Sequence, residues 1–166
     1  MKKIIIIGCP GSGKTTLAKL LEDKLSLPVI HLDKLQWKGN WETVRGEEFD
    51  NLLKAEMEKE AWIIDGNYNR TIPMRLKYCD TVIYLDYHTA VSFSGALTRL
   101  FRNYGKVRQD MGGNCYERFD PQFFWFILTF NIKNRKRYYR MLKDSEDKNV
   151  IILRSRKEAE KFLKDI

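Results

Sequence analysis

The chain has 166 residues, of which 43% are hydrophobic and 31% are charged, and its formal net charge is +8 at pH 7. This length and apolar content predict one domain, residues 1–166, around one buried core. No apolar run approaches the roughly 18 residues that span a bilayer, and the run near the start is shorter than the roughly 7 to 15 apolar residues of a signal peptide. These observations argue against a membrane protein and predict a cytoplasmic one.

The three cysteines are Cys9, Cys79 and Cys115. Their number is odd, none belongs to a C-x-x-C pair, and no pair of histidines lies nearby. This pattern argues against a disulfide framework and against a structural zinc site.

The first predicted strand, residues 4–7, runs directly into a phosphate-binding motif. Residues 8–15 read Gly-Cys-Pro-Gly-Ser-Gly-Lys-Thr, which matches the pattern G-x-x-x-x-G-K-[ST], and a helical pattern follows. Glycines let the backbone N–H groups surround a phosphate chain, while Lys14 reaches the outer phosphates and the Thr15 hydroxyl holds a magnesium ion. The predicted nucleotide-binding residues are Gly8, Cys9, Pro10, Gly11, Ser12, Gly13, Lys14, Thr15 and Thr16.

Strand and helix patterns alternate along the rest of the chain. Leu17, Leu21 and Leu25 recur at helical spacing, and Pro28 ends this first helix. Short apolar runs predict further strands at residues 29–33, 62–65, 81–86 and 149–153. Helices are predicted at residues 47–60, 73–78, 90–103, 121–143 and 157–166. Because strands alternate with helices, we expect an α/β fold in which helices cover both faces of a parallel sheet.

Two segments interrupt this alternation. The first, at about residues 34–60, contains Trp37 and Trp41, whose rings would either stack on a planar acceptor or pack against the core. We interpret it as an acceptor-binding insertion. The second, residues 105–120, contains Gly112 and Gly113, and we expect it to be a mobile connection.

Three aspartates end predicted strands. Asp33, Asp65 and Asp86 would lie beyond the carboxyl ends of a parallel sheet, where ligands bind in such folds. Phosphoryl transfer needs acids there, one to hold the magnesium shell and one to accept a proton or to orient the attacking group. Asp65 fits the metal-supporting role. Asp33, expected on the same strand face as His31, fits either role. The alternative is that these acids cap turns and helices, which is the preferred reading for Asp86.

The excess positive charge lies in one segment. Residues 99–143 contain eleven Lys and Arg and three Asp and Glu, so this segment alone accounts for the net charge of +8. Guanidinium groups neutralise the charge of a transferring phosphoryl group, and a lid that closes over nucleotide would use them. The candidate lid arginines are Arg99, Arg102, Arg135 and Arg137. A solvated basic face and a nucleic-acid surface are the alternatives, and charge alone does not choose between them.

The combined pattern resembles the P-loop kinase family that includes adenylate, shikimate and gluconate kinases, and within it the adenylate-kinase-related DNA topology modulation proteins. The resemblance is carried by the phosphate loop, by Val-Ile-His-Leu-Asp at 29–33, by the tryptophan stretch, by Trp-Ile-Ile-Asp-Gly-Asn-Tyr at 62–68 and by the basic segment. It implies a three-layer α/β/α fold of the P-loop NTPase type. The sheet would have five parallel strands in the order 2-3-1-4-5, with ATP bound at the phosphate loop.

The resemblance also implies roles for individual residues. Asp65 and Gly66 match the Asp-Gly of the adenylate kinase motif Asp-Gly-Phe-Pro-Arg, with Asp65 near magnesium. Asp33 matches the acid that shikimate kinase uses near its acceptor hydroxyl. Arg70 stands two positions later than the arginine of the adenylate kinase motif, and this departure leaves nucleoside monophosphate specificity open. The implied acceptor-binding residues are Asp33, Trp37, Trp41, Asn67 and Arg70.

We therefore expect a magnesium- and ATP-dependent kinase whose acceptor is a nucleotide or another small metabolite bearing a hydroxyl or phosphate group. The alternative is a nucleotide-switched regulatory protein that binds DNA through residues 99–143, with an affinity that falls steeply as salt is added. No helix-turn-helix or other nucleic-acid module is evident in the sequence.

Overall fold

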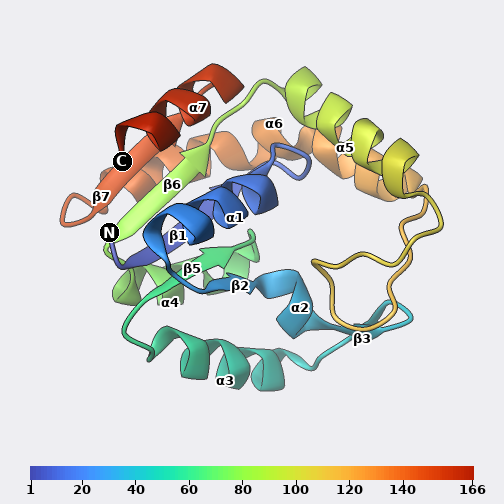
Figure 1. The fold of residues 1–166 in the computed structure, drawn as a ribbon, viewed down its shortest axis with the longest axis horizontal. Helices are drawn as coiled ribbons and strands as arrows, with labels where there is room; N and C mark the ends of the chain where they lie inside the picture. Colours follow the sequence, from blue (N-terminus) through green and yellow to red (C-terminus); the bar gives the residue numbers. More distant parts are fainter.

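Five parallel strands form the central sheet of the molecule (Figure 1). The computed structural model describes residues 1–166, and the strands of this sheet are β1 (Lys3–Gly8), β2 (Val29–His31), β5 (Trp62–Asp65), β6 (Thr81–Leu85) and β7 (Asn149–Leu153). Their order across the sheet is β2-β5-β1-β6-β7, and every neighbouring pair is parallel. Counted along the chain, this is the order 2-3-1-4-5, so the expected α/β fold and strand order are confirmed.

The central position of β1 explains the unbroken apolar run near the start of the chain. Ile5 pairs with Ile64 of β5 on one side and with Val82 of β6 on the other. Residues 4–7 are four isoleucines without exposed surface. In a parallel sheet covered on both faces, apolar side chains occupy every position of a strand instead of alternate positions. The run is therefore that of a central strand with helices on both sides.

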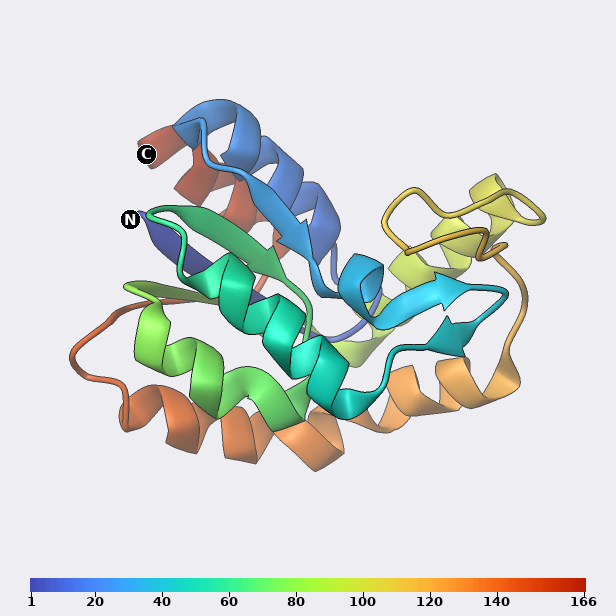
Figure 2. The same cartoon turned by 90° about the horizontal axis from the view of Figure 1, so that it is seen from below.

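Helices cover the two faces of the sheet unequally. The helices α1 (Lys14–Leu25) and α7 (Arg156–Asp165) lie on one face, and α3 (Gly46–Met57), α4 (Ile72–Tyr78), α5 (Thr89–Asn103) and α6 (Pro121–Lys143) lie on the other. Figure 2 shows α1 and α7 above the sheet and α3, α4 and α6 below it. None of these helices combines the length and the apolar character needed to cross a membrane.

The second strand is shorter than predicted. It ends at His31, and residues Leu32–Gln36 form the short helix α2. The expectation that Asp33 shares a strand face with His31 is therefore wrong, because Asp33 lies in the first turn of α2. The helical turn lets the Leu32 side chain enter the core without exposed surface. It also puts the Asp33 carboxylate near a helix N-terminus, where negative charge is favourable.

The tryptophan stretch forms a hairpin. Strands β3 (Trp37–Gly39) and β4 (Glu42–Thr43) pair in antiparallel fashion, and Asn40 and Trp41 between them have φ values of 46° and 63°. Positive φ values of this kind are typical of the tight turns that join two twisted strands. The helix α3 follows directly, close to the predicted range 47–60.

The segment between α5 and α6, residues 104–120, folds back on this hairpin, and we call it the lid (Figures 1 and 2). Gly112 packs so closely against the hairpin that a Cβ there would lie 1.8 Å from the carbonyl oxygen of Trp37. The Arg118 guanidinium lies 5.0 Å from the centroid of the Trp41 ring, in a cation–π arrangement. The lid is therefore anchored to the hairpin by a close backbone contact and by one aromatic contact.

Candidate functional site

The phosphate loop joins β1 to α1 and rests against α5. Gly13, with φ of 97°, immediately precedes α1, and a Cβ there would meet no atom within 4 Å. Gly11 lies against α5, where a Cβ would come within 2.2 Å of the Ser92 carbonyl oxygen. Loop residues and the first N–H groups of α1 therefore border open space on one side and packed backbone on the other. Helix N-termini of this kind attract phosphate because their N–H groups lack partners within the helix.

Lys14 folds back over the loop. Its Nζ atom donates hydrogen bonds to the carbonyl oxygens of Gly8 at 2.9 Å and of Cys9 at 3.0 Å. Burial lowers the pKa of the Lys14 amine, and the nearby Asp65 carboxylate opposes that shift. The amine is thus held where an anion entering the loop would meet it.

Thr15, Asp65 and His31 form a connected group beside the loop. The Thr15 hydroxyl donates to Oδ2 of Asp65 at 2.7 Å, and Nδ1 of His31 lies 3.1 Å from the same oxygen. Asp65 ends β5 and His31 ends β2, and the two residues are paired in the sheet. The adjacent carboxyl ends of two strands therefore bring one carboxylate and one imidazole to the start of α1.

Asp33 and Tyr68 form a second pair near Asp65. The Tyr68 hydroxyl donates to Oδ1 of Asp33 at 2.7 Å, and the Tyr68 ring stacks on Phe49 with centroids 5.1 Å apart. Burial raises the pKa of the Asp33 carboxyl, and the hydrogen bond from Tyr68 opposes that shift. Burial, together with the Asp33 charge, raises the pKa of the Tyr68 hydroxyl. The hydroxyl therefore stays a donor to Asp33.

A buried arginine supports the segment that carries Tyr68. Arg75 of α4 has no exposed surface, and its guanidinium donates to the carbonyl oxygens of Gly66, at 2.9 Å, and of Asn67. Burial lowers the pKa of Arg75 to about 10. The Asn67 side chain in turn accepts a hydrogen bond from the Gly8 N–H at 3.0 Å, which ties this segment to the phosphate loop.

A cleft of about 830 Å³ joins these groups. The phosphate loop and α1 line it with Pro10, Gly11, Gly13, Lys14, Thr15, Thr16 and Lys19. The segments after β2 and β5 line it with His31, Asp33, Asp65, Gly66, Asn67 and Tyr68. From α5, the lid and α6 come Gly95, Arg99, Asn103, Lys106, Val107, Arg108, Gln109, Asp110, Glu117, Phe123 and Phe126. Ten of the residues predicted from the sequence line this cleft: Pro10, Gly11, Gly13, Lys14, Thr15, Thr16, Asp33, Asp65, Asn67 and Arg99.

Two loop residues face away from the cleft. Cys9 and Ser12 are both buried, and the Cys9 sulfur lies 3.8 Å from the carbonyl oxygen of Ile127 in α6. Burial raises the pKa of the Cys9 thiol. These two side chains therefore fill the space between the loop and the helices behind it.

The arginines of the basic segment divide into two groups, and the first faces the cleft. Nε of Arg99 lies 3.1 Å from Oε2 of Glu117, and Nε of Arg108 lies 3.6 Å from the same oxygen. Arg108 also forms a close ion pair with Asp110, with Nη2 2.7 Å from Oδ2. Both cleft arginines are therefore already paired with carboxylates of the lid.

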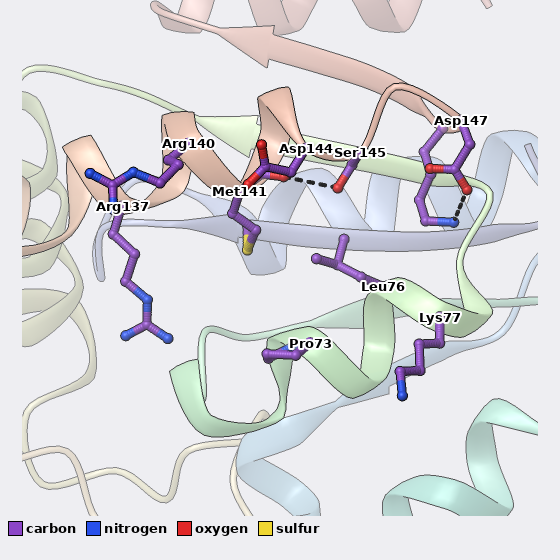
Figure 3. Close-up of a pocket in the computed structure, with 10 residues that line it drawn as sticks. Pro73, Leu76, Lys77, Arg137, Arg140, Met141, Asp144, Ser145 and Asp147 are labelled. Atoms are coloured by element: carbon purple, nitrogen blue, oxygen red, sulfur yellow. Dashed lines mark hydrogen bonds and ion pairs between the residues drawn. The ribbon is translucent and has the colours of Figure 1, made fainter.

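The second group lies away from the cleft. Arg102 is exposed at the end of α5, and Arg135 pairs with the buried Asp86 carboxylate at 2.9 Å. Arg137 donates to the Asn69 carbonyl oxygen at 3.4 Å and lines a separate groove of about 510 Å³ between α4 and α6, together with Arg140 and Lys77 (Figure 3). The structure does not bring these predicted lid arginines to the phosphate loop.

Three predicted acceptor-binding residues also lie outside the cleft lining. Trp37 and Trp41 pack on each other edge to face, with ring centroids 5.4 Å apart. Arg70 forms two hydrogen bonds with the Asp50 carboxylate, at 2.6 and 2.8 Å, on the exposed side of the insertion. Tertiary contacts within the insertion and with the lid therefore occupy all three side chains.

Comparison with known protein families agrees with the phosphate loop and the cleft. A sequence model of the AAA domain family matches residues 4–162. The chain belongs to this family, among the P-loop kinases.

Two curated relatives of this P-loop kinase-family protein carry the name "Putative adenylate kinase". The one from Pyrococcus abyssi (strain GE5 / Orsay) is 31% identical over 118 residues, which cover 67% of this chain and 60% of the relative. The one from Methanocaldococcus jannaschii is 36% identical over 63 residues, which cover 38% of this chain and 35% of the relative. The chain thus matches less than two thirds of the length of either.

A crystal structure of shikimate kinase from Bacteroides thetaiotaomicron has the same fold as this P-loop kinase-family protein. The TM-score is 0.59, and the superposition covers 98% of this chain and 94% of the other. Sequence identity is 22%, so this similarity bears on the fold alone.

The oxygen donors beside the loop fit a magnesium ion bound together with nucleotide. The Thr15 hydroxyl and the Asp65 carboxylate lie 2.7 Å apart, and both are the hard oxygen ligands that Mg²⁺ prefers. The protein has no cluster of three or more acidic, histidine or cysteine side chains that would enclose a metal on its own. Mg²⁺ usually takes one or two protein oxygens and completes its shell with water and substrate phosphates. The residues present therefore fit a Mg²⁺–nucleotide complex better than a free metal site.

Several site residues were not identified from the sequence. Tyr68 lines the cleft, and Arg75 supports the segment that carries it. Asp110 and Glu117 are the carboxylates that pair with Arg108 of the predicted basic segment. The left-handed Tyr68, with φ of 37°, has no sequence signal of its own because tyrosine rarely adopts this conformation. The alternation of Arg108 with Asp110 was the available signal for the lid pair.

Proposed function

We propose that this P-loop kinase-family protein transfers the γ-phosphoryl group of ATP to a hydroxyl of a small acceptor bound at Asp33. One observation carries the proposal: Lys14 and Thr15 of the phosphate loop line the same cleft as Asp33. A donor phosphate and an acceptor hydroxyl bound at these two positions would meet inside one protein-walled space. Such positioning supplies much of the rate enhancement in phosphoryl transfer.

The loop side of the cleft binds the phosphates of ATP. The backbone N–H groups before α1 and the Lys14 amine hold the outer phosphates, and Thr15 with Asp65 would hold Mg²⁺. When bound, Mg²⁺ neutralises charge on the oxygens of the phosphoryl group. His31 fixes the orientation of Asp65 by contacting the same oxygen that Thr15 contacts. Lys19 and Lys106 add positive charge to the walls of the cleft.

The Asp33 side of the cleft activates the acceptor. The Asp33 carboxylate orients the attacking hydroxyl and accepts its proton, while Tyr68 holds the other carboxylate oxygen at 2.7 Å. Burial raises the pKa of Asp33, which makes its carboxylate a stronger base. The docked lid covers this side of the cleft and excludes water that would otherwise compete with the acceptor.

The test is ADP formation from Mg–ATP by the purified protein, with and without a panel of nucleosides, nucleoside monophosphates, shikimate and gluconate. We expect acceptor-dependent ADP formation by the wild type. Lys14→Ala should lower kcat by about 10²–10³-fold, as expected for loss of one preorganised charge donor. Asp33→Asn should lower kcat by about 10²-fold or more while nucleotide binding stays near the wild-type value. Equal ADP formation by the wild type and Lys14→Ala would contradict the proposal.

A further inference from the structure

Near Asp33, the Arg108 guanidinium of the lid already has carboxylate partners. We select six of the cleft-lining residues and call them the acceptor half: Asp33, Asn67, Tyr68, Arg108, Gln109 and Asp110. Its only cation, Arg108, donates to both oxygens of Asp110 at 3.2 and 2.7 Å, and it lies 3.6 Å from Glu117. With two carboxylates and one guanidinium, the six residues of the acceptor half carry a formal charge of −1.

The insertion adds no positive charge to the acceptor half. No residue between 34 and 60 lines the cleft. The arginine that follows the Asp-Gly segment, Arg70, is turned outward and held by both oxygens of Asp50, with its side chain 60% exposed. Arg70, which the resemblance implied as an acceptor-binding residue, therefore forms an exposed ion pair outside the cleft lining.

The groups that remain available in the acceptor half suit hydroxyls. Oδ1 of Asp33 accepts from Tyr68, which leaves Oδ2 to accept from a ligand. The side-chain oxygen Oδ1 of Asn67 accepts from the Gly8 N–H, which leaves the side-chain nitrogen Nδ2 of Asn67 as a donor. A hydroxyl both donates and accepts, so it satisfies a carboxylate and an amide at once, whereas an anion would face the carboxylates of Asp33 and Asp110.

We infer that the acceptor of this enzyme is an uncharged, hydroxyl-bearing molecule of the nucleoside or polyol class, and not a nucleotide or a sugar acid. The inference rests on the proposed function and narrows it. In the reaction, the acceptor oxygen bonds to the γ-phosphorus of ATP, and the bond from that phosphorus to the β,γ-bridging oxygen breaks. Its electron pair leaves with ADP, and the hydroxyl proton passes to Asp33.

Asp110 is the residue that sets this preference. It neutralises Arg108, which would otherwise present a guanidinium fork to an acceptor phosphate. Replacing Asp110 with Asn keeps the shape of the side chain and removes the negative charge. The substitution therefore frees part of the Arg108 charge, and it also removes a carboxylate whose charge raises the pKa of Asp33.

The experiment compares matched acceptors that differ in one anionic group. ADP formation from Mg–ATP is measured with adenosine, cytidine, guanosine and uridine against their 5′-monophosphates, and with sorbitol against gluconate. We expect kcat/KM for the neutral member of the active pair to exceed that of its anionic partner about tenfold or more, because like charges in a cleft strongly disfavour the wrong ligand. Asp110→Asn should reduce this ratio, through a lower KM for the anionic partner. Preference for the anionic member by the wild type would overturn the inference.

A binding measurement separates this inference from the proposed function. The wild type loaded with Mg²⁺ and a non-hydrolysable ATP analogue is titrated calorimetrically with AMP and with adenosine. Tighter binding of AMP than of adenosine would overturn the acceptor class while leaving phosphoryl transfer in place. ADP formation that no member of the panel raises above the Lys14→Ala level would instead overturn the proposed function, and the acceptor class with it.

Discussion

Tyr68 donates a hydrogen bond of 2.7 Å to Asp33 from a backbone with φ of 37° and ψ of 65°. A non-glycine residue in this left-handed region carries strain, and surrounding contacts must hold it there. Here the ring stacks on Phe49, and the Arg75 guanidinium binds the carbonyl groups of the two preceding residues. The strain is thus maintained at the residue that contacts the proposed catalytic base, where it fixes the direction of the hydroxyl.

Removal of the Tyr68 hydroxyl should shift the pH dependence of catalysis. Tyr68→Phe deletes a hydrogen bond to the ionised form of Asp33, so the pKa of Asp33 should rise further. Hydrogen bonds to charged groups contribute about 1.5–3 kcal/mol, which corresponds to a shift of roughly one to two pH units. We therefore expect the acid limb of the kcat profile to move to higher pH by that amount.

The control for this profile is Tyr78→Phe, since Tyr78 lies at the exposed end of α4 and does not line the cleft. Its profile should coincide with that of the wild type. An unshifted acid limb in Tyr68→Phe would show that Asp33 is not the group that titrates in the reaction.

The ionised Asp33 carboxylate should lower the free energy of unfolding at neutral pH. Its pKa is raised above the ordinary value of 3.8, so the folded state binds more protons than the unfolded state between those two pKa values. The free energy of unfolding therefore falls as pH rises through that window, by about 1.4 kcal/mol for each unit by which the pKa is raised. Asp33→Asn removes this dependence, so the variant should be more stable than the wild type above the window and gain little below it.

Urea unfolding of both proteins from about pH 4 to about pH 8 tests this relation. The difference in unfolding free energy should grow with pH and then level off. A difference independent of pH would mean that the carboxyl group has the same pKa in both states.

The parts of the fold that follow from local pattern were predictable from the sequence. The isoleucines of residues 4–7 and the apolar run of β5 mark buried parallel strands, because no polar residue interrupts them. The phosphate loop is equally local, since its conformation depends on glycines within a few residues. The order of the strands followed from the resemblance to P-loop kinases, because hydrophobic pattern alone does not specify which strands are neighbours.

The parts of the site that depend on long side chains were not predictable. Arg99 and Glu117 are 18 residues apart, and Arg135 and Asp86 are 49 apart, yet each pair forms an ion pair in the folded chain. An arginine has many rotamers, and only the tertiary environment selects the carboxylate that it meets. Spacing therefore indicated a basic segment, while the division of its arginines between the cleft and the outer surface required the structure.

The two arginines after Asp65 should differ sharply in their effect on stability. Arg75→Met leaves the carbonyl groups of Gly66 and Asn67 without a buried charged donor, so the free energy of unfolding should fall by about 3 kcal/mol. Arg70→Met breaks only the exposed pair with Asp50, which should cost about 1 kcal/mol or less.

Urea unfolding at one pH gives both values, and the two variants control for each other because the same substitution is made five positions apart. Equal losses would show that the carbonyl groups held by Arg75 find other partners. Arg75→Met should also raise the KM for the acceptor, since the segment that carries Tyr68 loses its support.

The close contact between the lid and the hairpin should be needed for a covered cleft. A Cβ at Gly112 would lie 1.8 Å from the Trp37 carbonyl oxygen and 2.8 Å from that of Lys34, so Gly112→Ala must separate the lid from the hairpin. We expect kcat/KM to fall about tenfold or more, since small displacements of groups that enclose a reaction have effects of this size. Limited proteolysis should also cut residues 104–120 faster than in the wild type. The control is Gly105→Asn, because a side chain there meets no atom within 4 Å and asparagine tolerates the positive φ of 70°. If Gly112→Ala matches Gly105→Asn in both measurements, the contact with the hairpin does not hold the lid over the cleft.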